Sequence, residues 1–300
     1  MRFRTTILQS GKTAAGIEVP PDIVDALTFR VGTTGTAERS TSMDTVTSKD
    51  GTVISYERLG DGPPVVLVCG GSVDRWSNAG LAAILAADFT VFNYDRRGRG
   101  ESGDTPPYAV AREVEDIDAV IGAASEPAFL YGSSSGAALA LEATAAGLAV
   151  RKLALWEPPY ILDPAMRPPA DQVQQYQAML GEGRRGDAAQ YFMEKVVRMP
   201  PEFVAGARSQ PWWAATEALA HTLPYDATIM GDYSLPIASA AKVTVPAIVI
   251  TGAASFGFMR ETAEALGKAL PDGRTALIEG QEHNIAPEAI SPVLKAFYLG

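Results

Sequence analysis

The chain is expected to fold as an α/β protein with a mainly parallel sheet flanked by helices. From residue 44 onward, short apolar runs alternate with helical patterns, which is typical of parallel strands covered by helices. One long segment, 160–242, departs from this alternation, because it is rich in helical patterns and lies between two predicted strands. An insertion there is a candidate cap over the carboxyl ends of the strands, where open α/β sheets bind ligands.

The predicted core strands are short runs rich in β-branched and other apolar residues. The first two are expected to form a hairpin around Lys49-Asp50-Gly51. In chain order the strands are Thr45–Ser48, Thr52–Glu57, Val65–Cys69, Thr90–Tyr94, Ala128–Tyr131, Leu153–Trp156, Ala247–Thr251 and Thr275–Ile278. Helical patterns lie near 77–87, 108–124, 135–148, 257–270 and 286–299.

These elements divide the chain into three parts. Residues 1–43 end in a polar stretch rich in Gly, Thr and Ser, and we predict an N-terminal appendage with a linker. Residues 44–159 and 243–300 form the predicted α/β core, and residues 160–242 form the predicted helical cap. A chain of 300 residues with 47% hydrophobic residues is large enough to bury an extensive core.

Charge and composition restrict the partners. The net charge of −10 argues against nucleic acid or an anionic membrane as a partner. Cys69 is the single cysteine, so an internal disulfide is impossible. The N-terminal residues lack the apolar region of a secretion signal, and no apolar run reaches transmembrane length. We predict a cytoplasmic protein that acts on a small molecule without a cofactor or metal, and the oligomeric state stays open.

The most informative motif lies at residues 130–136, which read Leu-Tyr-Gly-Ser-Ser-Ser-Gly. Gly132, Ser134 and Gly136 match the G-x-S-x-G nucleophile elbow, and the motif has its required context between a strand and a helix. The serine hydroxyl then lies above a helix N-terminus, where backbone N–H groups stabilise negative charge. We predict Ser134 as a nucleophile; an ordinary Gly/Ser-rich turn is the alternative.

A nucleophilic serine requires a general base, and the chain has 2 histidines. His221 lies in a helical stretch of the predicted cap, so we expect a cap or interface side chain there, with a substrate contact as the alternative. His283 follows the last predicted core strand, in a short loop that opens at the same sheet edge as the elbow. We therefore predict His283 as the base; a solvated loop histidine is the alternative.

Three further motifs accompany the elbow. Val68-Cys69-Gly70-Gly71-Ser72 follows the third predicted strand, Asp95-Arg96-Arg97-Gly98-Arg99-Gly100-Glu101-Ser102 follows the fourth, and Gly280-Gln281-Glu282-His283 follows the last. With these motifs, the chain from about residue 44 to its end resembles the α/β-hydrolase superfamily, and within it serine hydrolases of the esterase or lactonase kind. The resemblance implies an α/β-hydrolase fold, a helical cap between the sixth and seventh core strands, and a triad of serine, histidine and an acid.

The acid departs from the superfamily pattern. The usual Asp lies in a G-x-x-D turn after the strand predicted at Ala247–Thr251, and this chain has Ser255 at that position. Glu157 directly follows the strand predicted at Leu153–Trp156, which neighbours the Ala247–Thr251 strand in the superfamily's strand order. Since adjacent strands are about 4.8 Å apart, the longer glutamate side chain can serve from there. We predict Glu157 as the triad acid; a strand-end carboxylate that caps the first turn of the cap or pairs with an arginine is the alternative for this residue. Asp226, Asp232 or no acid at all are the other possibilities.

The remaining candidates concern the oxyanion hole and the substrate. Two backbone N–H groups must point to the developing oxyanion, and we predict those of Ser135 and Gly71, with Ser72 as the alternative to Gly71. Cys69 is expected to be a buried filler, and the run from Asp95 to Ser102 is expected to be structural, with arginines that pair with carboxylates. Substrate contacts are predicted for Ser72, Tyr160, Trp212, Trp213 and Phe256, with packing inside the cap as the alternative for the cap residues.

Together these residues predict a serine hydrolase. It would cleave a carboxylic ester or lactone of a small, largely hydrophobic substrate through an acyl-enzyme on Ser134. A C–C bond hydrolase, an acyltransferase or a perhydrolase would use the same triad. A ligand-binding protein with low turnover is the alternative outside these enzyme classes, and the missing G-x-x-D acid would be its first sign.

Overall fold

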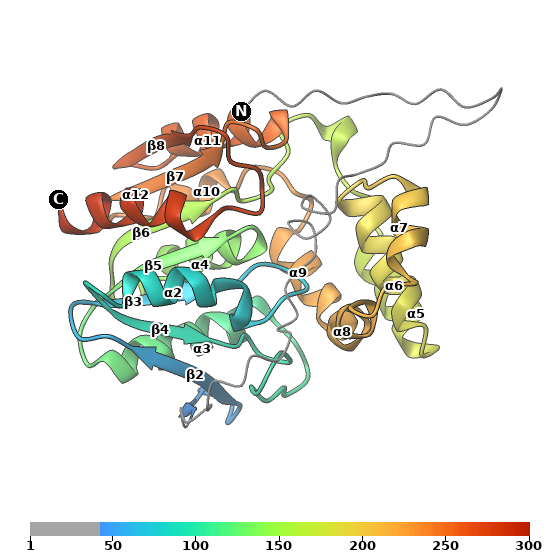
Figure 1. Cartoon of the computed structure of the whole chain (residues 1–300), viewed down its shortest axis with the longest axis horizontal. Coiled ribbons are helices and arrows are strands. Elements are labelled where there is room, and N and C mark those ends of the chain that lie inside the picture. The colour runs from blue at the N-terminus through green and yellow to red at the C-terminus, as the bar shows by residue number, and fades with distance from the viewer. Residues whose placement is uncertain (1–42) are drawn as a thin grey trace. The chain divides into compact units, whose positions relative to one another are not determined.

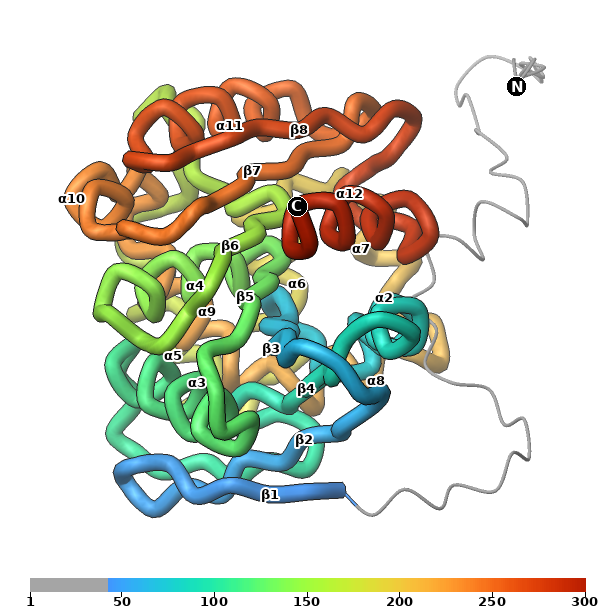
Figure 2. Tube along the Cα trace, turned by 90° about the vertical axis from the view of Figure 1, so that its left-hand side faces the viewer, coloured from blue at the N-terminus to red at the C-terminus, as the bar shows by residue number. Residues whose placement is uncertain are grey.

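A computed structural model describes residues 43–300 of the chain. Within them, the strands form one sheet in the order β1-β2-β4-β3-β5-β6-β7-β8 (Figure 1 and Figure 2). β2 pairs antiparallel with β1 and with β4, and all other neighbours are parallel. The mainly parallel sheet predicted from the sequence is therefore confirmed. The strands are β1 (Asp44–Thr47), β2 (Val53–Leu59), β3 (Pro64–Val68), β4 (Thr90–Tyr94), β5 (Ala128–Ser133), β6 (Val150–Trp156), β7 (Ala247–Gly252) and β8 (Gly273–Ile278).

Helices cover both faces of this sheet, as Figure 2 shows end-on. Those on one face are α2 (Ala79–Leu85) and α12 (Pro287–Leu299), which contact each other. Those on the other are α3 (Val110–Ala124), α4 (Ser135–Ala145) and α11 (Gly257–Ala269). A short 3₁₀ turn, η1 (Arg75–Asn78), precedes α2.

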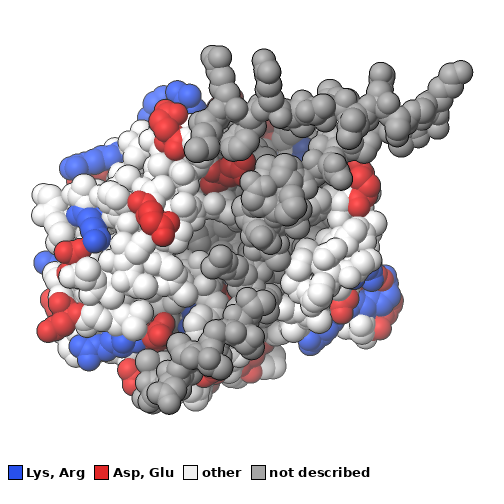
Figure 3. Space-filling model, in the orientation of Figure 1, with Lys and Arg blue, Asp and Glu red and all other residues white. Residues whose placement is uncertain are grey.

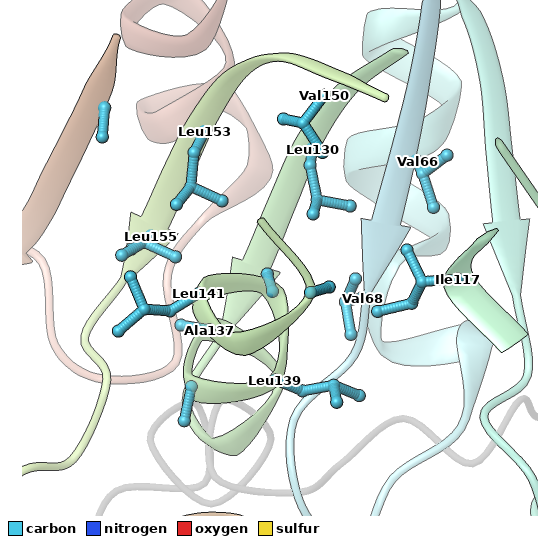
Figure 4. Close-up of a cluster of buried hydrophobic side chains, with 14 of the residues drawn as sticks. Val66, Val68, Ile117, Leu130, Ala137, Leu139, Leu141, Val150, Leu153 and Leu155 are labelled. Atoms are coloured by element: carbon cyan, nitrogen blue, oxygen red, sulfur yellow. The ribbon is translucent and has the colours of Figure 1, made fainter. Parts of the chain in front are cut away.

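Alternate residues of the central strands pack on opposite faces, as the period of a strand requires. In β3, Val66 and Val68 join the hydrophobic cluster against α3 and α4, part of which is drawn in Figure 4. Val65 and Leu67 join the cluster against α2 and α12. The central strands are thus buried on both sides, which explains why each appears in the sequence as a continuous apolar run. Because helices pack on both faces of these strands, the residues at the strand ends are held in place.

Between β6 and β7 the chain forms the predicted run of helices, and residues 160–242 are called the insert from here on. Two small clusters hold the insert together, one containing Tyr176 and Leu223 and the other Val204 and Trp213. In chain order the elements of the insert are η2 (Pro164–Met166), α5 (Gln172–Gly181), α6 (Arg185–Tyr191), η3 (Phe192–Val196), α7 (Pro201–Ala207), α8 (Trp213–Leu219), η4 (Ala220–Thr222), α9 (Leu223–Met230) and α10 (Ile237–Ala240).

The appendage predicted for residues 1–43 lies, apart from Met43, outside the described residues. In the part of the chain that is described, no helix combines the length and apolar character needed to cross a membrane. Acidic and basic side chains are interspersed over the described part of the face in Figure 3.

Candidate active site

The elbow between β5 and α4 has a strained backbone. Ser134 has φ 54° and ψ −125°, a conformation that costs a non-glycine residue about 1–3 kcal/mol. The flanking glycines are required by close packing. A Cβ on Gly132 would lie 2.4 Å from the carbonyl oxygen of Gly136, and one on Gly136 would lie 2.3 Å from that of Cys69. The turn is therefore held between α4 and the end of β3, with Ser134 at its centre.

The register of the sheet determines where Glu157 lies. β6 and β7 run parallel with Trp156 opposite Ile250, and the Glu157 N–H donates to the Ile250 carbonyl at 3.0 Å. Glu157 therefore leaves the end of β6 beside the end of β7. Its side chain is buried, with the residue 1% exposed, and φ is 42°.

Four hydrogen bonds converge on the Glu157 carboxylate. Oε1 accepts from the Thr251 hydroxyl and the Gly252 N–H, both at 2.9 Å. Oε2 accepts from the Ser255 hydroxyl at 2.8 Å and faces His283 Nδ1 at 2.6 Å. Two of these donors, Thr251 and Ser255, were not predicted as functional from the sequence. Ser255, which stands where the superfamily pattern has its usual acid, thus binds the Glu157 carboxylate through its hydroxyl.

These contacts keep the carboxylate ionised. Burial by itself would raise the pKa of Glu157, but the hydrogen bonds from His283 and the Gly252 N–H hold that pKa below its usual value. An ionised acceptor at Nδ1 favours the tautomer with its proton on Nδ1, which leaves Nε2 free to accept a proton. The Trp156 indole donates to the His283 carbonyl at 2.9 Å and thereby ties the histidine loop to β6.

The alternative acids lie elsewhere. Asp226, on α9, is buried and contacts Arg96, Arg99 and Ser135. Asp232 has a side chain that is 69% exposed and pairs with Arg167 at 3.2 Å. Of the three carboxylates considered, the one at His283 is that of Glu157.

The turn after β3 lies against the elbow. A Cβ on Gly70 would be 3.2 Å from Ser134 Cβ, and one on Gly71 would be 3.3 Å from Ser135 Oγ. Within residues 43–300, the N–H groups of Gly71 and Ser135 have no hydrogen-bond acceptor. The preceding Cys69 is fully buried, and burial raises the pKa of its thiol to about 11, as fits a packing residue.

The predicted substrate residues fall into two groups. Phe256 is 49% exposed with its ring centroid 6.3 Å from that of His283, and Ser72 follows Gly71 in the turn. Tyr160 and Trp213, by contrast, are buried in hydrophobic clusters of the core and of the insert. Trp212 packs on Trp213 at 6.2 Å between ring centroids. Substrate contacts from these residues stay predictions.

A buried ion cluster joins the insert to the core. Arg96 and Arg99, in the loop after β4, both bond to Asp226 at 2.9 Å. His221 also bridges the two parts, with Nε2 2.8 Å from the Gly98 carbonyl oxygen, which agrees with the expected cap or interface side chain. Pairing of the loop arginines with carboxylates was expected, but the partner was not, because Asp226 is 130 residues from Arg96.

The described part of the chain brings no three His, Cys, Asp or Glu side chains together in an arrangement that could hold a metal ion.

Comparison with known proteins agrees with this fold. Residues 65–291 match the model of the Alpha/beta hydrolase family. An alpha/beta hydrolase from Sphaerobacter thermophilus is 51% identical, with 85% of this chain and 100% of that one covered and a TM-score of 0.80. The esterase RhEst1 from Rhodococcus sp. and the enol-lactonase from Burkholderia xenovorans share the fold at 21% identity, with TM-scores of 0.65 and 0.64. The match to RhEst1 covers 87% of this chain and 99% of the esterase. The match to the enol-lactonase covers 86% of this chain and 100% of that protein.

A curated relative matches over a shorter stretch. An uncharacterized hydrolase from Bacillus subtilis, YraK, is 35% identical over 96 residues, which is 31% of this chain and 35% of that protein. The match thus spans about a third of the relative's length.

Proposed function

We propose that this chain, which belongs to the alpha/beta hydrolase family, is a serine hydrolase that cleaves a carboxylic ester or lactone through an acyl-enzyme on Ser134. The observation that carries the proposal is the 2.6 Å contact between the buried Glu157 carboxylate and His283 Nδ1. A histidine oriented in this way is a general base with Nε2 available, and the strained elbow presents Ser134 as the hydroxyl to be activated.

In the proposed reaction, Ser134 Oγ attacks the carbonyl carbon and its proton passes to His283 Nε2. Glu157 accepts the Nδ1–H of the resulting imidazolium and stabilises its charge. The tetrahedral intermediate collapses when the bond to the alcohol oxygen breaks, and His283 returns the proton to that oxygen. Water then attacks the acyl-enzyme carbonyl and gives a proton to His283. The bond to Ser134 Oγ breaks, the acid leaves, and His283 returns that proton to Ser134 Oγ, which restores the serine hydroxyl and the neutral base.

The negative charge of the intermediate requires donors that are already in place. We assign this role to the N–H groups of Gly71 and Ser135. Ser135 begins α4, so its N–H belongs to the first turn, where helical N–H groups have no intrahelical acceptor and attract negative charge. Gly71 lies on the other side of the elbow, in the turn after β3.

The aromatic residues beside the base support a hydrophobic substrate. Phe256 is half exposed next to His283 and stacks on Phe258 with 6.0 Å between ring centroids. Apolar surface of this kind gains from contact with an acyl or alcohol chain. The esterase and enol-lactonase that share the fold act on ester-type bonds by their names, which favours an ester or a lactone over an amide.

The proposal is tested by incubating the protein with a fluorophosphonate and locating the adduct by peptide mass. We expect one adduct, on Ser134, and hydrolysis of p-nitrophenyl acyl esters. Ser134→Ala should lose both, whereas Ser133→Ala, which removes the adjacent hydroxyl, should keep both. A panel of esters and lactones of graded size then identifies the preferred bond. A wild-type protein that neither takes the label nor hydrolyses any member of the panel contradicts the proposal.

A further inference from the structure

Asp226 of the insert lies at the junction of the two proposed oxyanion donors. Its Oδ1 accepts from the Ser135 hydroxyl at 2.8 Å. A Cβ on Gly71 would lie 3.2 Å from the Asp226 carboxyl carbon, so the carboxylate packs directly on that glycine. One carboxylate from α9 thus touches the residues on both sides of the proposed oxyanion hole.

Two arginines neutralise this carboxylate. Arg99 Nη2 donates to both Asp226 oxygens at 2.9 Å, and Arg96 Nη1 donates to Oδ1 at 2.9 Å. Arg96 also forms a two-bond pair with Glu113 at 2.7 and 2.8 Å. The cluster therefore contains two positive and two negative groups, all buried. Burial would raise the pKa of Asp226, but Arg99 and Arg96 hold it below its usual value, so the carboxylate is charged.

The same arginines hold the backbone of the turn after β3. Arg99 Nη1 donates to the carbonyls of Gly70 and Val73, and Arg96 Nη1 lies 3.4 Å from the Gly70 carbonyl oxygen. The Gly70 carbonyl and the Gly71 N–H belong to one planar trans peptide, in which they point in opposite directions. Arginines that hold the Gly70 oxygen therefore aim the Gly71 N–H away from themselves.

We infer that Asp226 is a positioning residue for the oxyanion hole: it holds Arg96 and Arg99 on the Gly70 carbonyl and Ser135 at the start of α4, so that the insert completes the site for negative charge. This inference rests on the proposed function. The insert then has a role beyond covering a substrate, because the docking of α9 sets the direction of two N–H groups on the core.

The test compares Asp226→Asn with Asp116→Asn. Asp116, on α3, is also buried and accepts two bonds of 2.7 Å from Arg97, which lies in the same loop as Arg96 and Arg99. Arg97 binds Asp116, Asp50 and the Arg112 carbonyl and not the turn after β3. Both variants lose one buried carboxylate, and their Tm values report the loss of stability. The activity readouts are kcat and KM for a p-nitrophenyl ester.

A second readout is the inhibition constant of a trifluoromethyl ketone. Ser134 Oγ adds to this ketone, its proton passes to His283, and the carbonyl oxygen becomes an oxyanion. Loss of an oxyanion donor costs about 10²–10³ in kcat. We expect Asp226→Asn to lower kcat about 10²-fold, to weaken the ketone by a similar factor, and to leave KM within about threefold. Asp116→Asn should lower Tm and keep kcat within about threefold.

Ser135→Ala gives an independent test, because it removes the hydroxyl bonded to Asp226 and keeps the Ser135 N–H. Misplacement of a reacting group by about 1 Å costs about 10²-fold in rate. Without its hydroxyl bond to Asp226, the Ser135 backbone should shift by less than this, so we expect a loss of about tenfold in kcat. Wild-type kcat in Ser135→Ala would overturn the inference, whether or not Asp226→Asn folds. Equal losses of kcat in Asp226→Asn and Asp116→Asn, or a raised KM at constant kcat, would overturn it too.

The outcome also separates this inference from the proposed function. If the wild-type protein takes no label on Ser134 and hydrolyses no ester, the proposed function fails and the inference fails with it. If the wild type reacts and Asp226→Asn reacts equally fast, the inference alone fails.

Discussion

Replacement of Glu157 by glutamine examines the proposed triad with the smallest change of shape. The substitution keeps the size of the side chain and removes its charge. Glu157 accepts four hydrogen bonds, two on each oxygen, so no orientation of an amide reproduces them. If the NH₂ group faces His283, it holds Nδ1 as an acceptor and shifts the proton to Nε2, where the base is needed. If it faces the other way, it opposes the N–H of Gly252.

The size of the effect follows from the ion pair. When His283 takes the serine proton, an imidazolium forms with Nδ1 2.6 Å from Glu157 Oε2. Unit charges about 4 Å apart at an effective dielectric constant of about 20 attract each other by about 4 kcal/mol. Since every ~1.4 kcal/mol is tenfold in rate, loss of this attraction lowers kcat about 10³-fold. With the wrong tautomer added, we expect a loss of about 10³–10⁴-fold, comparable to the loss of about 10⁴ when a serine protease loses its triad charge.

The assay is steady-state hydrolysis of a p-nitrophenyl ester, with circular dichroism and Tm to verify that the variant folds. Glu282→Gln is the matched control, because it removes the same charge at an exposed position one residue before His283. The control should remain within about threefold of the wild type. A Glu157→Gln variant whose kcat is within about tenfold of the wild type would refute the reasoning.

Three other changes have expected outcomes. Ser255→Asp in the Glu157→Gln background should recover at least about tenfold in kcat, because Ser255 Oγ lies 2.8 Å from the oxygen that faces His283; unchanged rates would contradict this. The pKa of Glu157 is lowered from its ordinary 4.5, so its stabilising contribution is complete above that pH and is lost as the pH falls through the folded value. The Tm difference between wild type and Glu157→Gln should therefore be larger at about pH 7 than at about pH 4, and an equal difference would count against it. Leu153→Ala, at a core position with 0% exposure, should lower the free energy of unfolding by about 2–5 kcal/mol in urea titrations, and a loss below about 1 kcal/mol would contradict the assigned packing.

Local patterns in the sequence were sufficient for most of the fold. The parallel strands appear at the predicted places because a strand buried on both faces must be a continuous apolar run. The ends of strands are less predictable. β2 continues to Leu59, past the predicted end at Glu57, because Leu59 pairs with Val91 of β4. Pairing across the sheet, which local apolar character does not report, determines where a strand ends.

By itself the sequence determined the elbow at Ser134 and the position of His283 after the last strand, because a motif and its flanking elements are local. Only the tertiary structure decided which carboxylate faces His283. Glu157 does so because the pairing of β6 with β7 carries it to Thr251 and Gly252. The tertiary structure also decided the place of Asp226, which the sequence left as an alternative candidate for the acid. Asp226 lies among Arg96, Arg99 and Ser135, and these contacts depend on how the insert docks on residues far away in the chain.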